Sequence, residues 1–68
     1  MDIRQKFGIK VRQNREKLKW SQEELADRCG LHRTYISGIE RGKRNPTLLI
    51  IEILANSLEV HPIDLLND

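Results

Sequence analysis

The run SQEELADRCGLHRTYISGIERG contains the start and stop signals of two short helices. Ser21 and Glu24 have the spacing of a capping box, in which each side chain accepts a hydrogen bond from the other residue's backbone N–H. Gly30 and Gly42 stand where a left-handed residue commonly ends a helix. The sequence therefore predicts one helix that ends at Gly30, a tight turn, and a second helix over residues 33–41.

Apolar residues also recur at helical spacing outside this run, and no alternating apolar and polar run predicts a strand. A first helix is expected over about residues 2–18, with Phe7, Val11 and Leu18 on one apolar stripe. Two more helices are expected beyond the central pair, over about residues 48–58 with Thr47 as its cap, and from Pro62 onward. The fold class is therefore all-α, with five helices in a single domain over residues 1–68.

Length and charge narrow the function classes. The chain has 68 residues and a mass of 8.0 kDa, the size of one small domain. All twelve Lys and Arg lie in residues 1–44 beside six Asp and Glu, whereas residues 45–68 hold four acidic residues and no basic one. This asymmetry suggests an anionic partner for the first part of the chain. No apolar run approaches the ~18 residues of a membrane span.

The two central helices fill the helix-turn-helix pattern. Ala26 is small where two crossing helices approach, and Gly30 supplies the positive φ that the turn needs. The chain resembles Cro and lambda-repressor type regulators over nearly its whole length. The run from Ser21 to Pro46 is especially similar to controller proteins of restriction-modification systems. This resemblance implies a compact five-helix, lambda-repressor-like DNA-binding domain.

The helix over residues 33–41 is expected to read DNA bases. Ile36 and Ile39 define its inward face, so the remaining side chains face away from the core or flank that outer side. The major groove of B-DNA admits an α-helix, and the first residues of a recognition helix reach base edges. We expect base contacts from Arg33, Thr34, Tyr35 and Ser37. Gly38 allows either a closer approach to the duplex or a tight crossing of two helices.

Phosphate contacts are expected around this recognition helix. Gln22 opens the preceding helix, where free backbone N–H groups favour an anion, and the resemblance implies a phosphate contact at this residue. The basic and polar residues that follow the recognition helix form the second expected phosphate-binding segment, namely Arg41, Lys43, Arg44 and Asn45.

Other chemistry is weakly supported. Cys29 and His32 have C-x-x-H spacing, but no second pair completes a tetrahedral zinc site, so no metal or other cofactor is expected. The single cysteine cannot form an internal disulfide, which is typical of a reducing compartment. No Ser, His and acid arrangement suggests an enzyme. The resemblance implies a structural ion pair between Arg15 and Glu40.

The acidic tail is expected to supply a dimer interface over about residues 47–67. The core stripe of the fourth helix is expected to be Leu48, Ile51, Leu54, Ala55 and Leu58. That leaves an apolar surplus, which with one residue of the fifth helix gives the expected interface of Leu49, Ile50, Ile53 and Leu65. Packing against the first or fifth helix is the alternative use of this surplus. Two residues depart from the family pattern: Glu59 stands where relatives usually have Gly at the end of the fourth helix, and His61 replaces the usual Ser or Thr before the fifth.

Together these features predict a cytoplasmic, bacterial or phage transcription regulator. A homodimer would bind a palindromic DNA operator whose half-sites lie about 34 Å apart, with no membrane partner. The resemblance to controller proteins implies control of its own gene and of a neighbouring endonuclease gene, with RNA polymerase as a further partner. The alternatives are an antitoxin, a helical protein-interaction module that uses the fourth helix, and the N-terminal part of a larger regulator.

Overall fold

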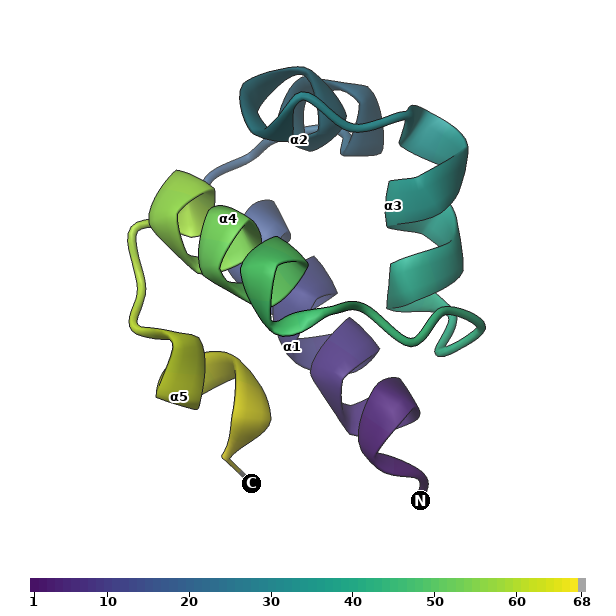
Figure 1. The fold of residues 1–68 in the computed structure, drawn as a ribbon. Coiled ribbons are helices and arrows are strands. Elements are labelled where there is room, and N and C mark those ends of the chain that lie inside the picture. Colours follow the sequence, from purple (N-terminus) through teal and green to yellow (C-terminus); the bar gives the residue numbers. More distant parts are fainter. Residues whose placement is uncertain (68) are drawn as a thin grey trace.

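The computed structural model describes residues 1–67 and contains five helices and no strand over that range. Helix α1 runs along one side of the molecule, α2 and α3 form a pair at one end, and α4 and α5 close the opposite side (Figure 1). The all-α prediction is confirmed. The bounds of the helices are α1 Ile3–Lys17, α2 Gln22–Cys29, α3 Arg33–Glu40, α4 Leu48–Leu58 and α5 Pro62–Leu66.

Helix α1 buries one face against α3, α4 and α5. Phe7 and Val11 lie in the core as expected, but Leu18 is 37% exposed, so its place on the buried stripe was wrong. The next buried position on this face is Arg15, four residues after Val11, and Leu18 lies beyond the last helical turn. Gly8 is also buried. Its backbone lies so close to α3 that a Cβ there would collide with the carbonyl oxygen of Ile39.

Helices α1 to α4 all end in the same hydrogen-bonded closure. In each, an N–H beyond the end of the helix bonds to the carbonyl oxygen five residues earlier, as Leu31 does to Ala26 at 2.9 Å and Val60 does to Ala55 at 3.0 Å. The residue just before that N–H has positive φ. It is glycine after α2 and α3, whereas α1 and α4 use Lys19 at φ 62° and Glu59 at φ 60°.

The start of α2 carries only half of the expected capping box. The Ser21 hydroxyl accepts from the N–H of Glu24 at 3.0 Å. The carboxylate of Glu24 instead accepts from Nε of Arg28 at 2.8 Å, one helical turn further on, so it does not reciprocate at Ser21. Thr47 caps α4 as expected, with its hydroxyl accepting from the N–H of Ile50.

The core draws on every helix, and two sequence assignments for α4 and α5 were wrong. Leu48 was expected inside, but it is 84% exposed because it lies in the first turn of α4, next to an extended loop. Leu65 was expected at the dimer interface, but it is 1% exposed because α5 folds back and inserts it into the core. The buried apolar residues are Phe7, Val11, Leu25, Ala26, Ile36, Ile39, Leu54, Ala55, Leu58 and Leu65.

Candidate nucleic-acid interface

The first residues of α3 present free side chains to solvent. Arg33 and Thr34 are exposed, and neither side chain forms a hydrogen bond or ion pair within residues 1–67. His32 precedes them without a side-chain cap, and its carbonyl oxygen accepts from the N–H of Tyr35 at 3.0 Å. Ile36 and Ile39, on the opposite side, anchor α3 in the core at 0% and 1% exposure. A helix anchored in the core therefore carries one long basic side chain and one short polar side chain outward from its N-terminal end.

The other two expected base-reading residues sit deeper. Tyr35 and Ser37 are half-buried, and Tyr35 packs partly against the core. The guanidinium carbon of Arg44 lies 5.4 Å from the centre of the Tyr35 ring, within the range of a cation–π contact. Arg44 was expected to bind phosphate, and the structure places its exposed side chain against α3.

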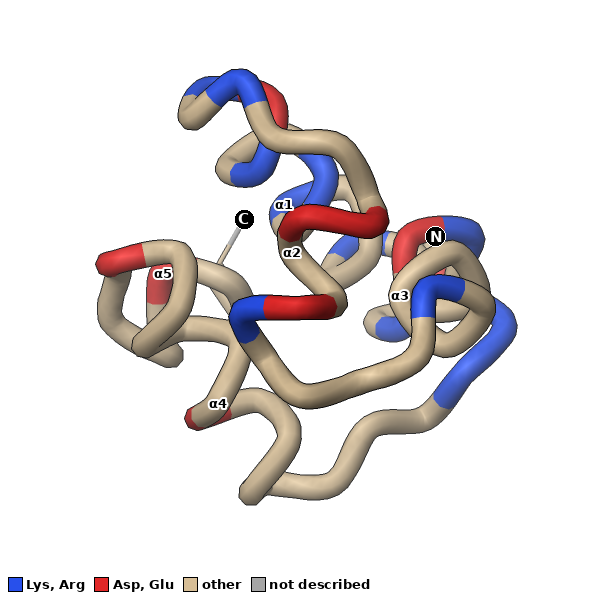
Figure 2. The backbone as a smooth tube through the Cα atoms, turned by 90° about the horizontal axis from the view of Figure 1, so that it is seen from above, with Lys and Arg blue, Asp and Glu red and all other residues tan. Residues whose placement is uncertain are grey.

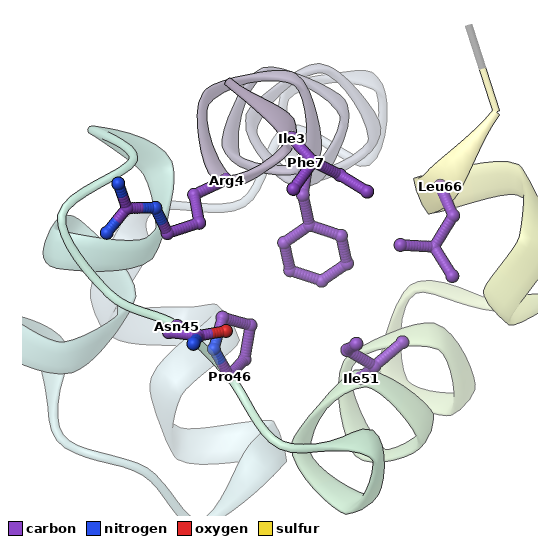
Figure 3. Close-up of a pocket in the computed structure, with 7 residues that line it drawn as sticks. All are labelled: Ile3, Arg4, Phe7, Asn45, Pro46, Ile51 and Leu66. Carbon is purple, nitrogen blue, oxygen red and sulfur yellow. The ribbon is translucent and has the colours of Figure 1, made fainter.

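The remaining residues of the basic segment stay near the surface. The Nε of Arg41 donates to the backbone oxygen of Ser37 at 3.3 Å, which keeps Arg41 beside the last turn of α3. Lys43 and Asn45 are exposed. Asn45 also lines a small pocket that lies between the start of α1 and residues of α4 and α5 (Figure 3). The pocket measures about 100 Å³, below the usual volume of a small-molecule site.

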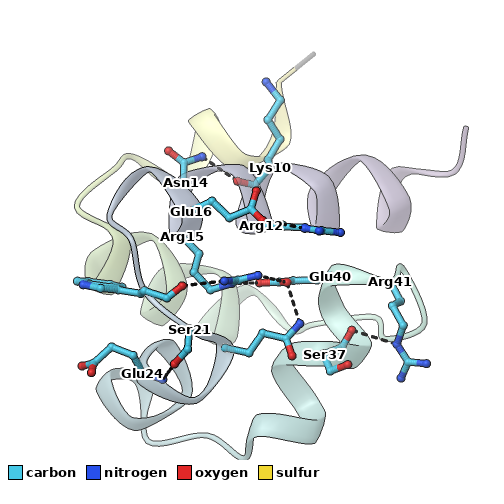
Figure 4. Close-up of polar contacts among 12 residues, drawn as sticks. Lys10, Arg12, Asn14, Arg15, Glu16, Ser21, Glu24, Ser37, Glu40 and Arg41 are labelled. Carbon is cyan, nitrogen blue, oxygen red and sulfur yellow. Dashed lines mark hydrogen bonds and ion pairs between the residues drawn. The ribbon is translucent and has the colours of Figure 1, made fainter.

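A buried polar network joins the ends of α1, α2 and α3. Nε and Nη2 of Arg15 donate to the two carboxylate oxygens of Glu40 at 2.7 and 3.0 Å, and Nη1 donates to the Trp20 carbonyl at 2.7 Å (Figure 4). The ion pair that the resemblance implied is therefore present, with the Arg15 and Glu40 side chains only 11% and 3% exposed. The hydrogen bonds to Glu40 raise the pKa of the Arg15 guanidinium above its ordinary value.

Gln22 belongs to this network, which sequence reasoning missed. Its Nε2 donates to Oε1 of Glu40 at 3.0 Å, and the side chain is half-buried. The amide has one further N–H, and the backbone N–H groups of the first turn of α2 lie beside it. No local signal predicted this bond, because 18 residues separate the two partners. The same holds for the contact of Gly8 with α3, although a glycine inside a strong helix pattern is itself a cue to close packing.

The charge asymmetry of the sequence becomes a spatial one. Basic residues occur on α1, at the start of α3 and in the loop after it, while α4 and α5 carry only acidic charges among their charged residues (Figure 2). Over residues 1–67, no cluster of His, Cys, Asp and Glu has the arrangement of a metal site. The half-buried Cys29 thiol has a raised pKa because of its burial. None of the described helices combines the length and apolarity that a membrane span requires.

Comparisons with known proteins agree with this geometry. A family model for helix-turn-helix proteins matches residues 11–65. Control protein C.BamHI of Bacillus amyloliquefaciens is 57% identical over 67 residues, covering 97% of this chain and 83% of that protein. The restriction-modification controller protein C.AhdI from Aeromonas hydrophila has a similar structure, with a TM-score of 0.88 and 44% identity over 91% of this chain and 94% of that one.

A third relative is known with nucleic acid. SinR, the master regulator for biofilm formation, was solved in complex with DNA, and it matches with a TM-score of 0.85 and 32% identity over 90% of this chain and 98% of its own. All three relatives carry names of regulators rather than of enzymes. The family match includes all of α2, α3 and α4. The chain therefore belongs to the helix-turn-helix family of transcriptional regulators and is similar over nearly its whole length to restriction-modification controller proteins.

Proposed function

We propose that this protein binds a two-fold symmetric DNA operator as a homodimer and regulates transcription of a restriction-modification operon. The observation that carries the proposal is the pair of free, exposed side chains at the N-terminal end of α3, Arg33 and Thr34. They project from a helix whose opposite face is locked in the core, so insertion of α3 into the major groove needs no refolding.

Within the groove, Arg33 is suited to guanine, because its guanidinium can donate two parallel hydrogen bonds to O6 and N7. Thr34 offers a methyl group for thymine and a hydroxyl for a base acceptor. Tyr35 and Ser37 lie further along the same helix and complete the proposed base-reading set. The proposed phosphate contacts come from the segment that follows, namely Arg41, Lys43, Arg44 and Asn45.

Gln22 is proposed as a phosphate contact on the other side of the motif. Its hydrogen bond to Glu40 uses one amide N–H and fixes the plane of the carboxamide. The second amide N–H and the open backbone N–H groups of α2 are then available to one phosphate oxygen. The buried ion pair thereby holds a DNA contact in position and also ties three helices together.

The proposed dimer interface lies on α4 and α5. Leu48 and Leu49 are 84% and 63% exposed at the start of α4, and Ile63 and Leu66 are exposed on α5. Several exposed apolar residues on two helices that pack against each other fit an association surface. The half-buried residues Ile50 and Ile53 remain in the proposed interface, and Leu48 joins Leu49 there. Since this half carries no Lys or Arg, it fits a role away from DNA.

Selection of bound duplexes from a random DNA pool at ~150 mM salt tests the proposal, because non-specific phosphate binding is weak under those conditions. We expect a two-fold symmetric motif with half-site centres about one helical turn apart. Absence of any enriched sequence at concentrations where the protein is dimeric would contradict DNA reading. It would favour a protein-interaction role for α4.

Two variants in the same selection separate base reading from phosphate binding. We expect Arg33→Ala to relax one base position in each half-site and to cost about 1–3 kcal/mol on the selected sequence. The matched control Lys43→Ala removes a basic side chain outside the helix, and it should weaken binding to all duplexes alike. Equal losses on selected and random DNA for both variants would contradict the assignment of Arg33 to a base.

The regulatory part of the proposal rests on the controller proteins C.BamHI and C.AhdI. We expect the selected motif upstream of the protein's own gene and of a neighbouring endonuclease gene. A promoter reporter titrated with the protein should then show activation at low dose and repression at high dose. Motif occurrences remote from any such gene would overturn the controller assignment and leave DNA binding intact.

A further inference from the structure

We infer that Gly38 is a positioning residue that seats the Arg44 side chain against α3, so that Arg44 meets DNA from a fixed place on the recognition helix. The inference rests on the proposed function, because its consequence is measured on DNA. Gly38 lies in the middle of α3, and neither core packing nor helix propensity explains a glycine there.

The position of Gly38 is unusual for a helical glycine. Gly38 lies two residues after Ile36 and therefore on the other side of α3 from that core residue, and yet it is buried. Its nearest neighbours outside α3 are the side-chain atoms of Arg44: a Cβ on Gly38 would lie 2.9 Å from Cγ and 3.1 Å from Nε of that residue. The stem of Arg44 therefore covers the backbone of α3 in the space that a side chain at position 38 would fill.

Two further contacts hold the Arg44 side chain in this position against Gly38, which we call the Arg44 seat. The Arg44 guanidinium lies over the Tyr35 ring, 5.4 Å from its centre, one helical turn before Gly38. The loop that carries Arg44 is also bonded to α3, because the N–H of Lys43 donates to the carbonyl oxygen of Gly38 at 2.8 Å. A glycine, an aromatic ring and a backbone hydrogen bond thus bring a loop residue onto the helix.

The seat explains why a helix-weakening residue stands in the recognition helix. Glycine in a helix interior is disfavoured relative to alanine, and the close neighbours of Gly38 are side-chain atoms of Arg44 rather than another helix backbone. Of the two uses that the sequence left open, the tight helix crossing is found at Gly8. At Gly38 the missing Cβ accommodates Arg44.

A double-mutant cycle tests the inference on two probes: the selected duplex at ~150 mM salt, and a random-sequence 20-base-pair duplex at ~50 mM salt. We expect Gly38→Ala to lower affinity for the selected duplex about tenfold in the natural background and less than twofold in the Arg44→Ala background. Its unfolding temperature should be equal or higher, because alanine strengthens the helix. A loss of equal size in both backgrounds would show that Gly38 acts by direct approach to DNA and would overturn the inference.

Two substitutions of Tyr35 test whether its aromatic ring holds the Arg44 side chain. Tyr35→Phe keeps the ring and should retain the upfield NMR shift that the ring imposes on the Arg44 side-chain protons, whereas Tyr35→Leu and Gly38→Ala should both lose it. Arg44 shifts that are unchanged in Gly38→Ala would overturn the seat without reference to DNA. Failure of the natural protein to bind either duplex would instead overturn the proposed function, and with it the consequence for DNA.

Discussion

The two halves of this small domain are stabilised in different ways. The half formed by α1, α2 and α3 adds directional polar contacts to its share of the apolar core, with Glu40 accepting from both Arg15 and Gln22 while its side chain is 3% exposed. The half formed by α4 and α5 depends on apolar burial, and the residues that it does not bury are mostly leucine and isoleucine. A surface that must present polar groups at fixed angles needs hydrogen bonds behind it, whereas a surface that adheres to a second apolar surface needs only shape.

The largest effect is expected from removing the shared carboxylate of the polar half. Glu40→Ala leaves the Arg15 guanidinium buried without its counter-charge and should lower the free energy of unfolding by about 3–5 kcal/mol. Urea denaturation followed by far-UV circular dichroism measures this loss. The exposed pair of Arg12 and Glu16 is the matched control, since Arg12→Ala should cost under about 0.5 kcal/mol. Similar losses for the two variants would mean that burial of the pair has no energetic consequence.

The apolar half is tested by two leucines of the same helix. Leu54 is fully buried, so Leu54→Ala leaves a cavity and should cost about 2–4 kcal/mol of unfolding free energy. Leu48→Ala, measured at a protein concentration where the chain is monomeric, should cost almost nothing because Leu48 is exposed. A large loss for Leu48→Ala in the monomer would show that α5 or the preceding loop covers this residue.

An intermediate effect is expected on association. Leu49→Glu places a charge on the proposed interface and should weaken dimerisation at least tenfold, which corresponds to about 1.4 kcal/mol. Sedimentation equilibrium measures the dimer affinity directly. In the natural protein the urea midpoint should also rise with protein concentration, and in the variant it should not. A natural protein that stays monomeric at ~100 µM would contradict the dimer, and the exposed leucines would then require another partner.

The smallest effect contrasts the two kinds of helix ending. Glu59 ends α4 at φ 60°, a conformation that a residue with a Cβ adopts at a cost, so Glu59→Gly should raise the free energy of unfolding by about 0.5–1 kcal/mol. The reverse change after α3, Gly42→Ala, should be destabilising, because its φ is 72° and a Cβ there would lie 2.8 Å from Cγ of Gln5. Thermal unfolding of both variants checks the two signs, and a stabilising Gly42→Ala would refute the argument.

Much of the fold could be predicted because helix signals are local. The helix starts after Ser21 and Thr47, and the end at Gly30, depend on residues within one turn of each boundary. The buried face of α3 followed from Ile36 and Ile39, the two apolar side chains of a short helix. The exposure of Arg33 and Thr34 followed from the same reasoning.

The rest depended on contacts that no local pattern encodes. Helix α4 has apolar residues on several faces, so its periodicity did not show that the first turn around Leu48 is uncovered. Leu65 entered the core because of the path of the chain between α4 and α5. Glu24 had two partners within reach, and no local pattern indicates whether its carboxylate bonds to Arg28 or to the backbone N–H of Ser21. The seat of Arg44 on Gly38 depends on how a loop folds back over the helix.

The freedom of Arg33 and Thr34 has a consequence for how such proteins diversify. Both side chains are exposed and neither has a hydrogen-bond or ion-pair partner within residues 1–67, so exchange of these two residues should change the proposed reading surface and leave the scaffold intact. If Arg33 and Thr34 read bases as proposed, operator preference can change through these two positions, in evolution or in a library randomised there, at little cost to folding. Closely related regulators built on such a scaffold could then coexist in one cell without competing for each other's promoters.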